Sequence, residues 1–291
     1  MFERILGIML PVFVVVMLGY LYARRAKPDM TEVNKISSTL IAPALIFTAL
    51  ASKDFDAAAN GLLMIGCVGV VLGSGVLAWP IARWLGYDYR TFVPPMMFNN
   101  CGNMGLPLAA LAFGPPGFSA MVALFAISNL IQFTLGTWLV DHKARFGSLM
   151  RNPMVWSTFV GFAFALFHPP LPAWIGTGIR IVGDALIPMM LLSLGVRLYE
   201  VRWSDVRIGV IGAVVCPVAG IAMALVLAPL LGLSDLQRGL LVLFGALPPA
   251  VFNFIVAEHY DQEPGKVASI VLIGNTLAVA FVPLGLTLAL R

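Results

Sequence analysis

Long stretches without a charged residue limit most strongly how this chain can fold. Charge is absent from residues 5–23, 36–52, 57–82, 91–140, 152–179, 208–234, 239–257 and 267–290. About 20 residues of helix cross the hydrocarbon core of a bilayer, which is about 30 Å thick. Only 11% of the residues are charged and 60% are hydrophobic, against about 25% charged in soluble domains. The sequence therefore predicts an integral membrane protein whose outer surface contacts membrane lipid.

The charge-free blocks divide into ten expected transmembrane helices, which makes the fold class all-α and polytopic. The run from Thr91 to Val140 contains Pro115, Pro116 and Gly117, which predict a tight turn between two helices. The apolar block from Ala185 to Val196 forms another helix if Asp184, just before it, lies within the membrane. The expected helices are 5–23, 33–51, 60–82, 91–113, 117–140, 152–168, 177–197, 208–231, 236–258 and 266–289.

Lysine and arginine are distributed unevenly between the two sides of this topology. The loops after the first, third, fifth, seventh and ninth helices hold thirteen of them, and the other side holds five. Because cytoplasmic loops retain positive charge, both termini are predicted to lie in the periplasm, with the chain in the cell inner membrane. The charges are scattered over short loops, so the net charge of +4 indicates topology and not a nucleic-acid partner.

An ordered series of matches predicts an internal repeat at offsets of 142 to 148 residues, beginning with Pro11 and Gly19, which match Pro153 and Gly161. The two halves, 1–145 and 146–291, then hold five helices each, and the odd number inverts the second half. Inverted repeats are the architecture of many secondary transporters, with the binding site near the middle of the membrane. The matches are 40–43 with 185–188, 116–117 with 264–265 and 127–129 with 273–275.

Two of the expected helices carry helix-breaking residues at corresponding depths. Residues 98–107 place three Asn and two Gly inside 91–113, and residues 246–253 place two adjacent prolines inside 236–258. Freed backbone groups need partners in a low-dielectric medium, so the breaks should line a cavity. If they cross, two helix N-termini with partial positive charge face one point, which suits a carboxylate. Simple kinks with satisfied amides are the alternative.

We expect Asn100, Asn103 and Asn253, with the free amides beside Pro107 and Pro248, to form an anion site. An Asn amide donates two hydrogen bonds without adding a buried charge. Asp184 is the candidate for carrying a proton, because acids within a membrane are costly; pairing with Arg180 at a helix end is the alternative. The further candidates for the substrate site are Asn99, Pro43, Thr48, Ser193 and Asn275; for Pro43 a plain kink is an equal alternative.

The stretch 100–108, Asn-Cys-Gly-Asn-Met-Gly-Leu-Pro-Leu, resembles a signature of the auxin efflux carriers, and 193–195, 246–248 and 257–260 are similar to other segments of that family. The resemblance implies the ten-helix fold of bile-acid symporters and sodium/proton antiporters. In that fold the first, second, sixth and seventh helices form a scaffold and the other six form a mobile crossover bundle. It also implies that Asn100 contacts a substrate carboxylate.

The long cytoplasmic loop of plant members is missing, which indicates a compact prokaryotic type, among which malonate and malate carriers are known. Asn99 and Asn253 stand where plant members have prolines, which disfavours auxin itself. The sequence thus predicts a secondary transporter of small mono- or dicarboxylates that works by alternating access, either proton-coupled or as a uniporter. A homodimer through the scaffold helices is a candidate assembly.

Two alternatives remain beside this interpretation. Sodium coupling is disfavoured because 91–113 and 236–258 hold no carboxylate at mid-depth, although Asn and backbone oxygens can also bind sodium. An intramembrane aspartyl protease is disfavoured because the first Gly of its Gly-x-Gly-Asp pattern is Ile181 here and Asp261 falls in a loop. Cys67, Cys101 and Cys216 have no paired spacing, so we expect no disulfide, no metal and no cofactor.

Overall fold

A computed structural model describes residues 2–142, 152–199 and 205–290. Within these ranges the chain is all helical, and its one extended pairing is an isolated β-bridge. The elements are α1 (Phe2–Ala26), α2 (Thr31–Ile36), η1 (Ser37–Ile41), α3 (Ala42–Leu50), α4 (Gly61–Leu85), α5 (Tyr89–Met97), η2 (Cys101–Gly105), α6 (Leu106–Ile131), η3 (Gln132–Gly136), α7 (Thr137–Val140), α8 (Pro153–Phe167), α9 (Ala173–Asp184), α10 (Leu186–Tyr199), α11 (Val206–Leu230), α12 (Asp235–Gly245), α13 (Phe252–His259) and α14 (Pro264–Ala289), with η denoting π-helix.

Seven helical stretches of the described chain are long and apolar enough to cross a membrane, which makes this a multi-pass membrane protein. They are Glu3–Ala26, Thr31–Leu50, Gly61–Leu85, Cys101–Val140, Ala173–Tyr199, Val206–Leu230 and Pro264–Ala289. The ten expected helices differ from these seven for local reasons. The segments 91–113 and 236–258 are each interrupted, and 152–168 forms α8 with 15 residues.

The turn expected at Pro115–Gly117 is instead a sharp kink one residue earlier. Gly114 has φ 68° and ψ −163°, and helical backbone continues on both sides of it within α6. Glycine adopts positive φ without a steric penalty, and the prolines that follow fit the first positions of a new helical segment. The chain therefore changes direction here without a separate loop.

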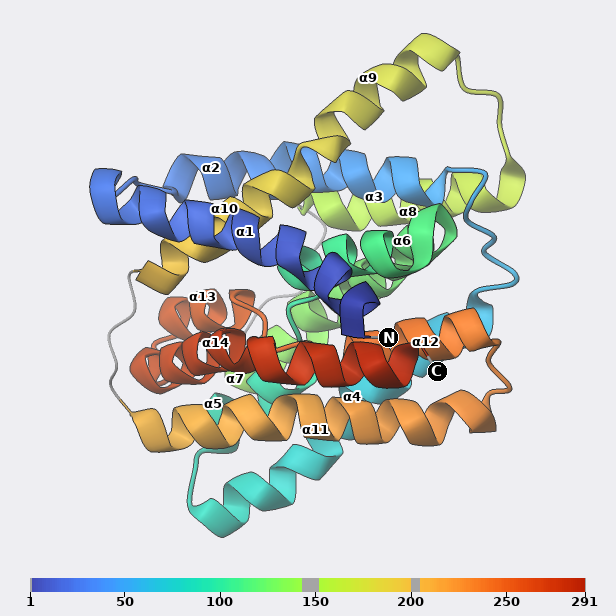
Figure 1. Ribbon diagram of the computed structural model, residues 1–291. Helices are drawn as coiled ribbons and strands as arrows, with labels where there is room; N and C mark the ends of the chain where they lie inside the picture. Colours follow the sequence, from blue (N-terminus) through green and yellow to red (C-terminus); the bar gives the residue numbers. More distant parts are fainter. Residues whose placement is uncertain (1, 143–151, 200–204, 291) are drawn as a thin grey trace.

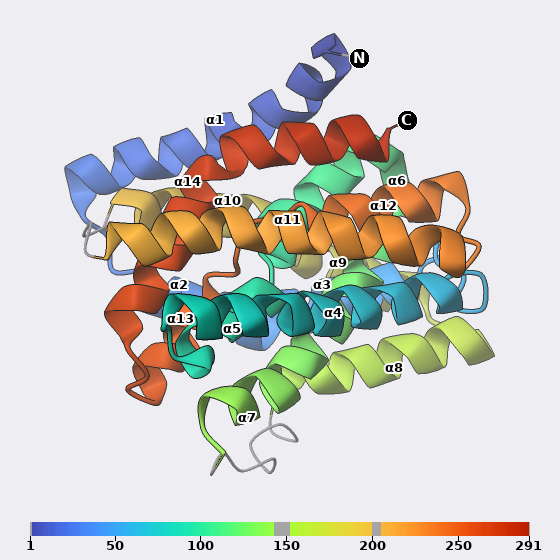
Figure 2. The same cartoon turned by 90° about the horizontal axis from the view of Figure 1, so that it is seen from below.

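The helices form two groups that share an interface. In Figure 1, α1, α2, α3, α9 and α10 lie in the upper part of the view, and α4, α5, α11, α12, α13 and α14 lie in the lower part. Within the upper group α1 packs on α10 and α3 on α8 and α9; within the lower group α11 packs on α4, α12 and α14. Figures 1 and 2 both show the two chain ends close together.

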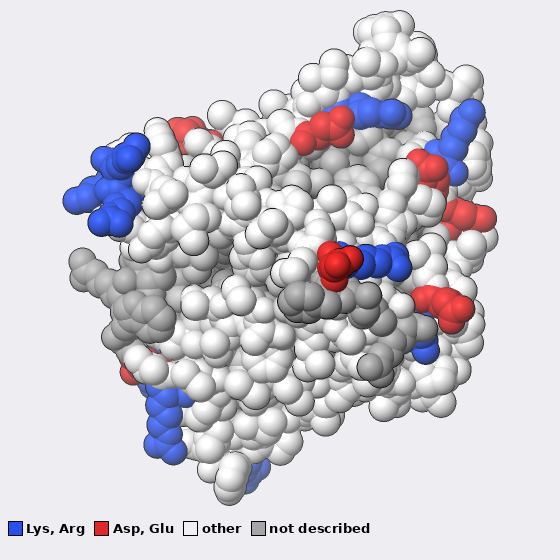
Figure 3. Space-filling model, in the orientation of Figure 1, with Lys and Arg blue, Asp and Glu red and all other residues white. Residues whose placement is uncertain are grey.

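Glycine allows the closest helix contact of the lower group. A Cβ on Gly220 of α11 would collide with the carbonyl oxygen of Gly245 in α12, and a Cβ on Gly245 would collide with Gly220 in return. Small residues at such interfaces let helix backbones approach closely in membrane proteins. On the face shown in Figure 3, most charged side chains lie toward the two ends of the long helices, with a broad uncharged surface between them.

Candidate functional site

The two interrupted helices meet at their breaks. Between α5 and η2, Phe98 is extended (φ −108°, ψ 104°), and Asn99 forms an antiparallel β-bridge with Pro249, which lies between α12 and α13. The Asn100 amide donates to the Pro248 carbonyl at 2.7 Å, and the Ala250 amide donates to the Phe98 carbonyl at 2.9 Å. Each break thus supplies hydrogen-bond partners for backbone groups that the other break leaves free.

Asparagine side chains complete this exchange at both helix ends. Asn99 Nδ2 donates to the carbonyl of Phe244, near the end of α12, at 2.5 Å. Asn253 Nδ2 donates to the carbonyl of Phe98, just beyond the end of α5, at 2.9 Å and to Ala250 at 3.0 Å. Since the last carbonyls of a helix lack partners within the helix, these amides satisfy them across the crossing. Gln132 Nε2 donates to Asn253 Oδ1 at 3.0 Å.

Asn275 of α14 forms hydrogen bonds to both breaks of the crossing. Its Nδ2 donates to the carbonyls of Pro249 at 3.0 Å and Val271 at 2.8 Å, while its Oδ1 accepts from Asn100 Nδ2 at 2.7 Å. Asn100 and Asn275 are both only 4% exposed. Because one amide hydrogen of Asn100 is used here, one remains for another acceptor.

A cavity of about 410 Å³ lies beside the crossing. Its wall is formed by residues of α2, η1 and α10 on one side and of η2, α6, η3 and the two breaks on the other. The first residues of η2 and α13, Cys101 and Phe252, also line it. The polar lining residues are Asn34, Ser37, Ser38, Thr39, Asn99, Asn100, Asn103, Ser128, Asn129, Gln132, Asn152, Ser193 and Arg197.

Buried polar atoms without a partner occur in this lining. Asn99 Oδ1 and Asn129 Nδ2 are both buried with no hydrogen-bond partner in the described structure. Asn103 is partly exposed to the cavity and makes no side-chain hydrogen bond within the described chain. An unpaired buried donor or acceptor is energetically costly, so these groups are ready to bind a polar ligand.

The charge of the lining is positive. Among the described residues that line the cavity, Arg197 is the one with a formal charge, and none is acidic. Arg197 is half-buried and follows Ser193 by one turn of α10, and Ser193 Oγ donates to Asn34 Oδ1 at 3.1 Å. A guanidinium group binds carboxylates through paired hydrogen bonds, so the electrostatics of the cavity favour an anion.

The structure brings some of the sequence-predicted residues together and separates others. Asn99, Asn100, Asn103 and Ser193 line the cavity. Asn253 and Asn275 are buried at the crossing next to it and are absent from the lining, as are Pro107 and Pro248. Pro43 and Thr48 lie in α3, where Thr48 Oγ1 donates to the Ala44 carbonyl at 3.0 Å. Asp184 is exposed at the end of α9, away from the cavity.

Sequence reasoning missed several polar residues of the lining, among them Asn34, Asn129, Gln132 and Arg197. A signal existed for Asn129 and Gln132, because polar residues three apart in an apolar helix share one face and are expensive in lipid. The expected helix 177–197 ends at Arg197, whose charge counts with the loop that follows, but α10 continues to Tyr199 and keeps Arg197 within the helix. Asn34 follows a loop and carried no comparable signal.

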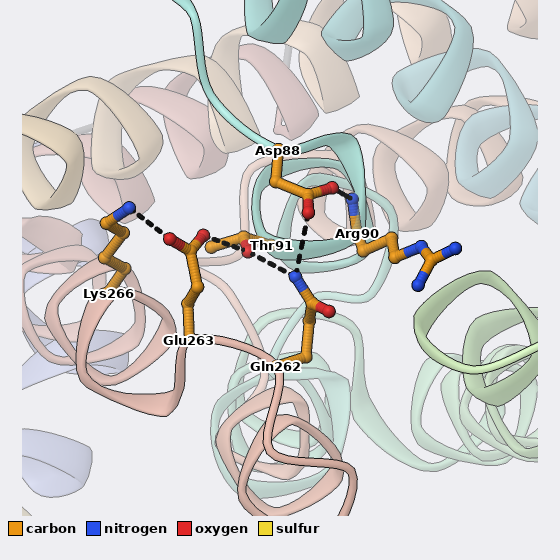
Figure 4. A network of polar contacts seen from close by, with 6 residues as sticks. All are labelled: Asp88, Arg90, Thr91, Gln262, Glu263 and Lys266. Carbon is orange, nitrogen blue, oxygen red and sulfur yellow. Dashed lines mark hydrogen bonds and ion pairs between the residues drawn. The ribbon is translucent and has the colours of Figure 1, made fainter.

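A polar network, drawn in Figure 4, ties the start of α5 to the connection between α13 and α14. Thr91 is fully buried, and its Oγ1 donates to Glu263 Oε2 at 2.6 Å. Gln262 Nε2 donates to Asp88 Oδ2 and to Thr91 Oγ1, both at 3.1 Å, and Lys266 pairs with Glu263. The network joins the first half of one interrupted helix to the second half of the other, which holds both segments of the crossing in place.

Two polar contacts join helices of the molecule outside the cavity lining. Ser52 Oγ, just beyond α3, lies 3.2 Å from Ser119 Oγ of α6. Arg4 of α1 donates to the carbonyl of Ala112 at 3.4 Å. The cavity instead extends toward Asn34, Asn152 and Arg197.

An interrupted-helix crossing beside a polar cavity, inside a multi-pass helical protein, is typical of membrane transporters. The family model described as membrane transport protein matches residues 4–147 and 137–286 of this chain. The chain belongs to this family, which is the family of the auxin efflux carriers, and the resemblance noted in the sequence is confirmed.

Individual relatives cover the chain to different extents. An "Uncharacterized transporter" of Methanothermobacter thermautotrophicus is 27% identical over 94% of this chain and 95% of its own length. A "Putative malonate transporter" of Rhizobium meliloti is 26% identical over 96% of this chain and 94% of its own length. "Auxin efflux carrier component 3a" of Oryza sativa is 28% identical over 45% of this chain and 22% of its own length.

Proposed function

We propose that the protein is a secondary transporter that binds small organic anions in the cavity beside the crossing. The observation that carries this proposal is the lining itself. Among the described residues that line the cavity, Arg197 is the one with a charge, and Asn129 Nδ2 is a buried donor without a partner. Asn100 and Asn103 supply further amide donors. Hydrogen bonds from a cation and neutral amides stabilise a carboxylate and still permit its release.

Dicarboxylates such as malonate are the proposed substrate class. A volume of about 410 Å³ lies within the range of about 300 to 1,000 Å³ that small-molecule sites occupy. One carboxylate would contact Arg197 and the other the amides of Asn103 and Asn129. The name of the Rhizobium meliloti relative supports this choice.

The transport mechanism we propose is alternating access between two inverted five-helix halves, 1–145 and 146–291. The proposed ten spans are the seven long apolar stretches with three additions. The stretch Cys101–Val140 is divided into two spans at the Gly114 kink, with α5 joined to the first of them, and α8 and α12–α13 each count as one span. Helices α1, α2–α3, α8 and α9–α10 would be the scaffold and the rest the crossover bundle. The cavity would then be open to the cytoplasm, with both termini in the periplasm of a cell inner membrane.

Asp184 is the proposed proton carrier. It lies eleven residues after Ala173, about 16 Å along the helix and near the middle of the span Ala173–Tyr199. The α9 helix ends at Asp184, and neighbouring Gly183 packs against the backbone of Leu45 in α3. Sodium coupling is the second candidate, because Asn99 Oδ1 is a buried acceptor without a donor and can bind a cation.

Counterflow in proteoliposomes tests the proposed function. Vesicles loaded with unlabelled malonate are diluted into a trace of labelled malonate, and we expect transient, saturable accumulation of label that malonamide, the neutral diamide, does not inhibit. A channel would give no counterflow. Absence of exchange with every mono- and dicarboxylate tried would refute the proposal.

A further inference from the structure

A second hollow lies outside the transport cavity, on the surface formed by α1, α2 and α10. It has a volume of about 1060 Å³ and is lined mainly by apolar side chains, among them Leu18, Leu192 and Val196. Leu18, Leu21 and Tyr22 of α1 are each about half exposed there. We call it the α1–α10 groove.

The groove arises from the way α1 and α10 cross. A Cβ on Gly19 would collide with the carbonyl oxygen of Leu192, and a Cβ on Gly195 would collide with the carbonyl oxygen of Val16. The two backbones therefore touch at the glycines, and the large side chains on either side of this contact diverge. A groove between diverging apolar side chains in a membrane protein is filled by acyl chains and not by water.

One end of the groove is cationic. Arg24 and Arg25, in the last turn of α1, line it and are exposed, and none of the described residues that line it is acidic. The nearest acids along the chain have other partners. Asp29 Oδ1 accepts from the amide of Thr31 at 2.9 Å, and Glu32 pairs with Lys35 at 3.7 Å. The hydrogen bonds from Thr31 also lower the pKa of the Asp29 carboxyl.

The groove and the transport cavity share the walls α10 and α2. On α10, Met189, Leu192 and Val196 face the groove, and Met190, Ser193 and Arg197 face the cavity. On α2, Val33 lines the groove and the neighbouring Asn34 lines the cavity, where it accepts the hydrogen bond of Ser193. A molecule in the groove would thus contact the outer faces of α2 and α10, whose inner faces line the transport cavity.

We propose that the α1–α10 groove binds an anionic phospholipid, with its acyl chains between α1 and α10 and its phosphate on Arg24 and Arg25. The groove is apolar along its length and ends at two guanidinium groups, which matches a lipid whose apolar tails end at a phosphate. Basic pockets at the cytoplasmic ends of membrane helices recognise such headgroups. The bound lipid stabilises α2 and α10 against each other, and through them the Asn34–Ser193 side of the cavity.

Lipid binding to the purified protein tests this proposal without reference to any transported substrate. The probes are dioleoyl phosphatidylglycerol and dioleoyl phosphatidylcholine, titrated in detergent with the thermal midpoint of unfolding as the readout. We expect phosphatidylglycerol to stabilise the parent at lower concentration than phosphatidylcholine. The double variant R24Q/R25Q should need roughly thirtyfold more phosphatidylglycerol, since each arginine near a lipid surface contributes about a fivefold factor.

Two matched variants make the result specific. Arg83→Gln removes an exposed arginine from the end of α4, outside the groove, and should leave the lipid preference unchanged. Leu192→Trp fills the groove at a partly exposed position and should abolish the preference in a protein that still folds. An equal loss in Arg83→Gln, an undiminished preference in Leu192→Trp, or a groove occupied by a second copy of the chain in cross-linking would each overturn the proposal.

Discussion

Asn100 of the first break donates a 2.7 Å hydrogen bond to Asn275 of α14, which in turn donates to the carbonyl of Pro249 in the second break. Asn275 therefore bridges the two breaks, and both its amide oxygen and its amide nitrogen form hydrogen bonds. We expect Asn275→Ala to lower the thermal midpoint, because it leaves buried partners at Asn100 and Pro249 unsatisfied at a cost of about 1 to 3 kcal/mol each. Thr276→Ala, an exposed neighbour bonded only to its own helix, is the control. Equal midpoints for both variants would show that Asn275 does not hold the crossing.

Substitution of Asn129, unlike that of Asn275, should weaken ligand binding and leave stability unchanged. Its Nδ2 is buried and has no partner, so Asn129→Ala removes no stabilising bond and should leave the thermal midpoint unchanged. Anion affinity should fall about ten- to a hundredfold, as expected for one lost hydrogen bond to a charged ligand. Thr134→Val provides a control in η3, which directly follows α6, because Thr134 Oγ1 bonds only to backbone carbonyls one turn earlier. Unchanged affinity in Asn129→Ala would remove this residue from the site.

The contact between Ser52 and Ser119 should break during transport. Their hydroxyl oxygens are 3.2 Å apart, and neither residue lines the cavity. In the double variant S52C/S119C, oxidation should join α6 to the end of α3 and stop counterflow, and reduction should restore it. Each single variant controls for oxidation elsewhere, since Cys67, Cys101 and Cys216 are buried. Full counterflow in the cross-linked protein would show that these segments need not separate.

Asp184→Asn tests proton coupling. If the carboxyl carries the proton, the variant should bind malonate with parental affinity but lose accumulation driven by a pH gradient. Asp54→Asn, which alters an exposed loop acid, should retain it. Gradient-driven uptake in Asp184→Asn equal to that of the parent would exclude this residue and favour uniport or sodium coupling, which replacing sodium with potassium distinguishes.

The breaks in the two interrupted helices could be predicted from the sequence because they depend on local chemistry. Proline removes a backbone donor and glycine weakens a helix wherever they occur, so 98–107 and 246–253 are interrupted as expected. The partners of the freed groups could not be predicted. Asn100 meets Asn275 across 175 positions of the chain, and that pairing depends on how α14 packs behind the crossing.

The role of each asparagine was likewise beyond the sequence. Asn253 and Asn100 are equivalent as residue types, yet both donor bonds of Asn253 go to backbone carbonyls, whereas Asn100 reaches the cavity. Charge counting places Arg197 at a membrane boundary but does not say which way its side chain faces. Because α10 extends to Tyr199, Arg197 stays in the helix, one turn after Ser193 and on the same cavity-lining face.

Calorimetric titration of the purified protein with malonate and with malonamide shows whether the cavity selects anions, because the two ligands differ chiefly in charge. We expect malonate to bind the parent, malonamide to give no measurable binding, and Arg197→Gln to weaken malonate binding about ten- to a hundredfold. Arg207→Gln, an exposed arginine at the start of α11, should bind like the parent. Equal binding of malonate and malonamide, or parental affinity in Arg197→Gln, would contradict an anion site in this cavity.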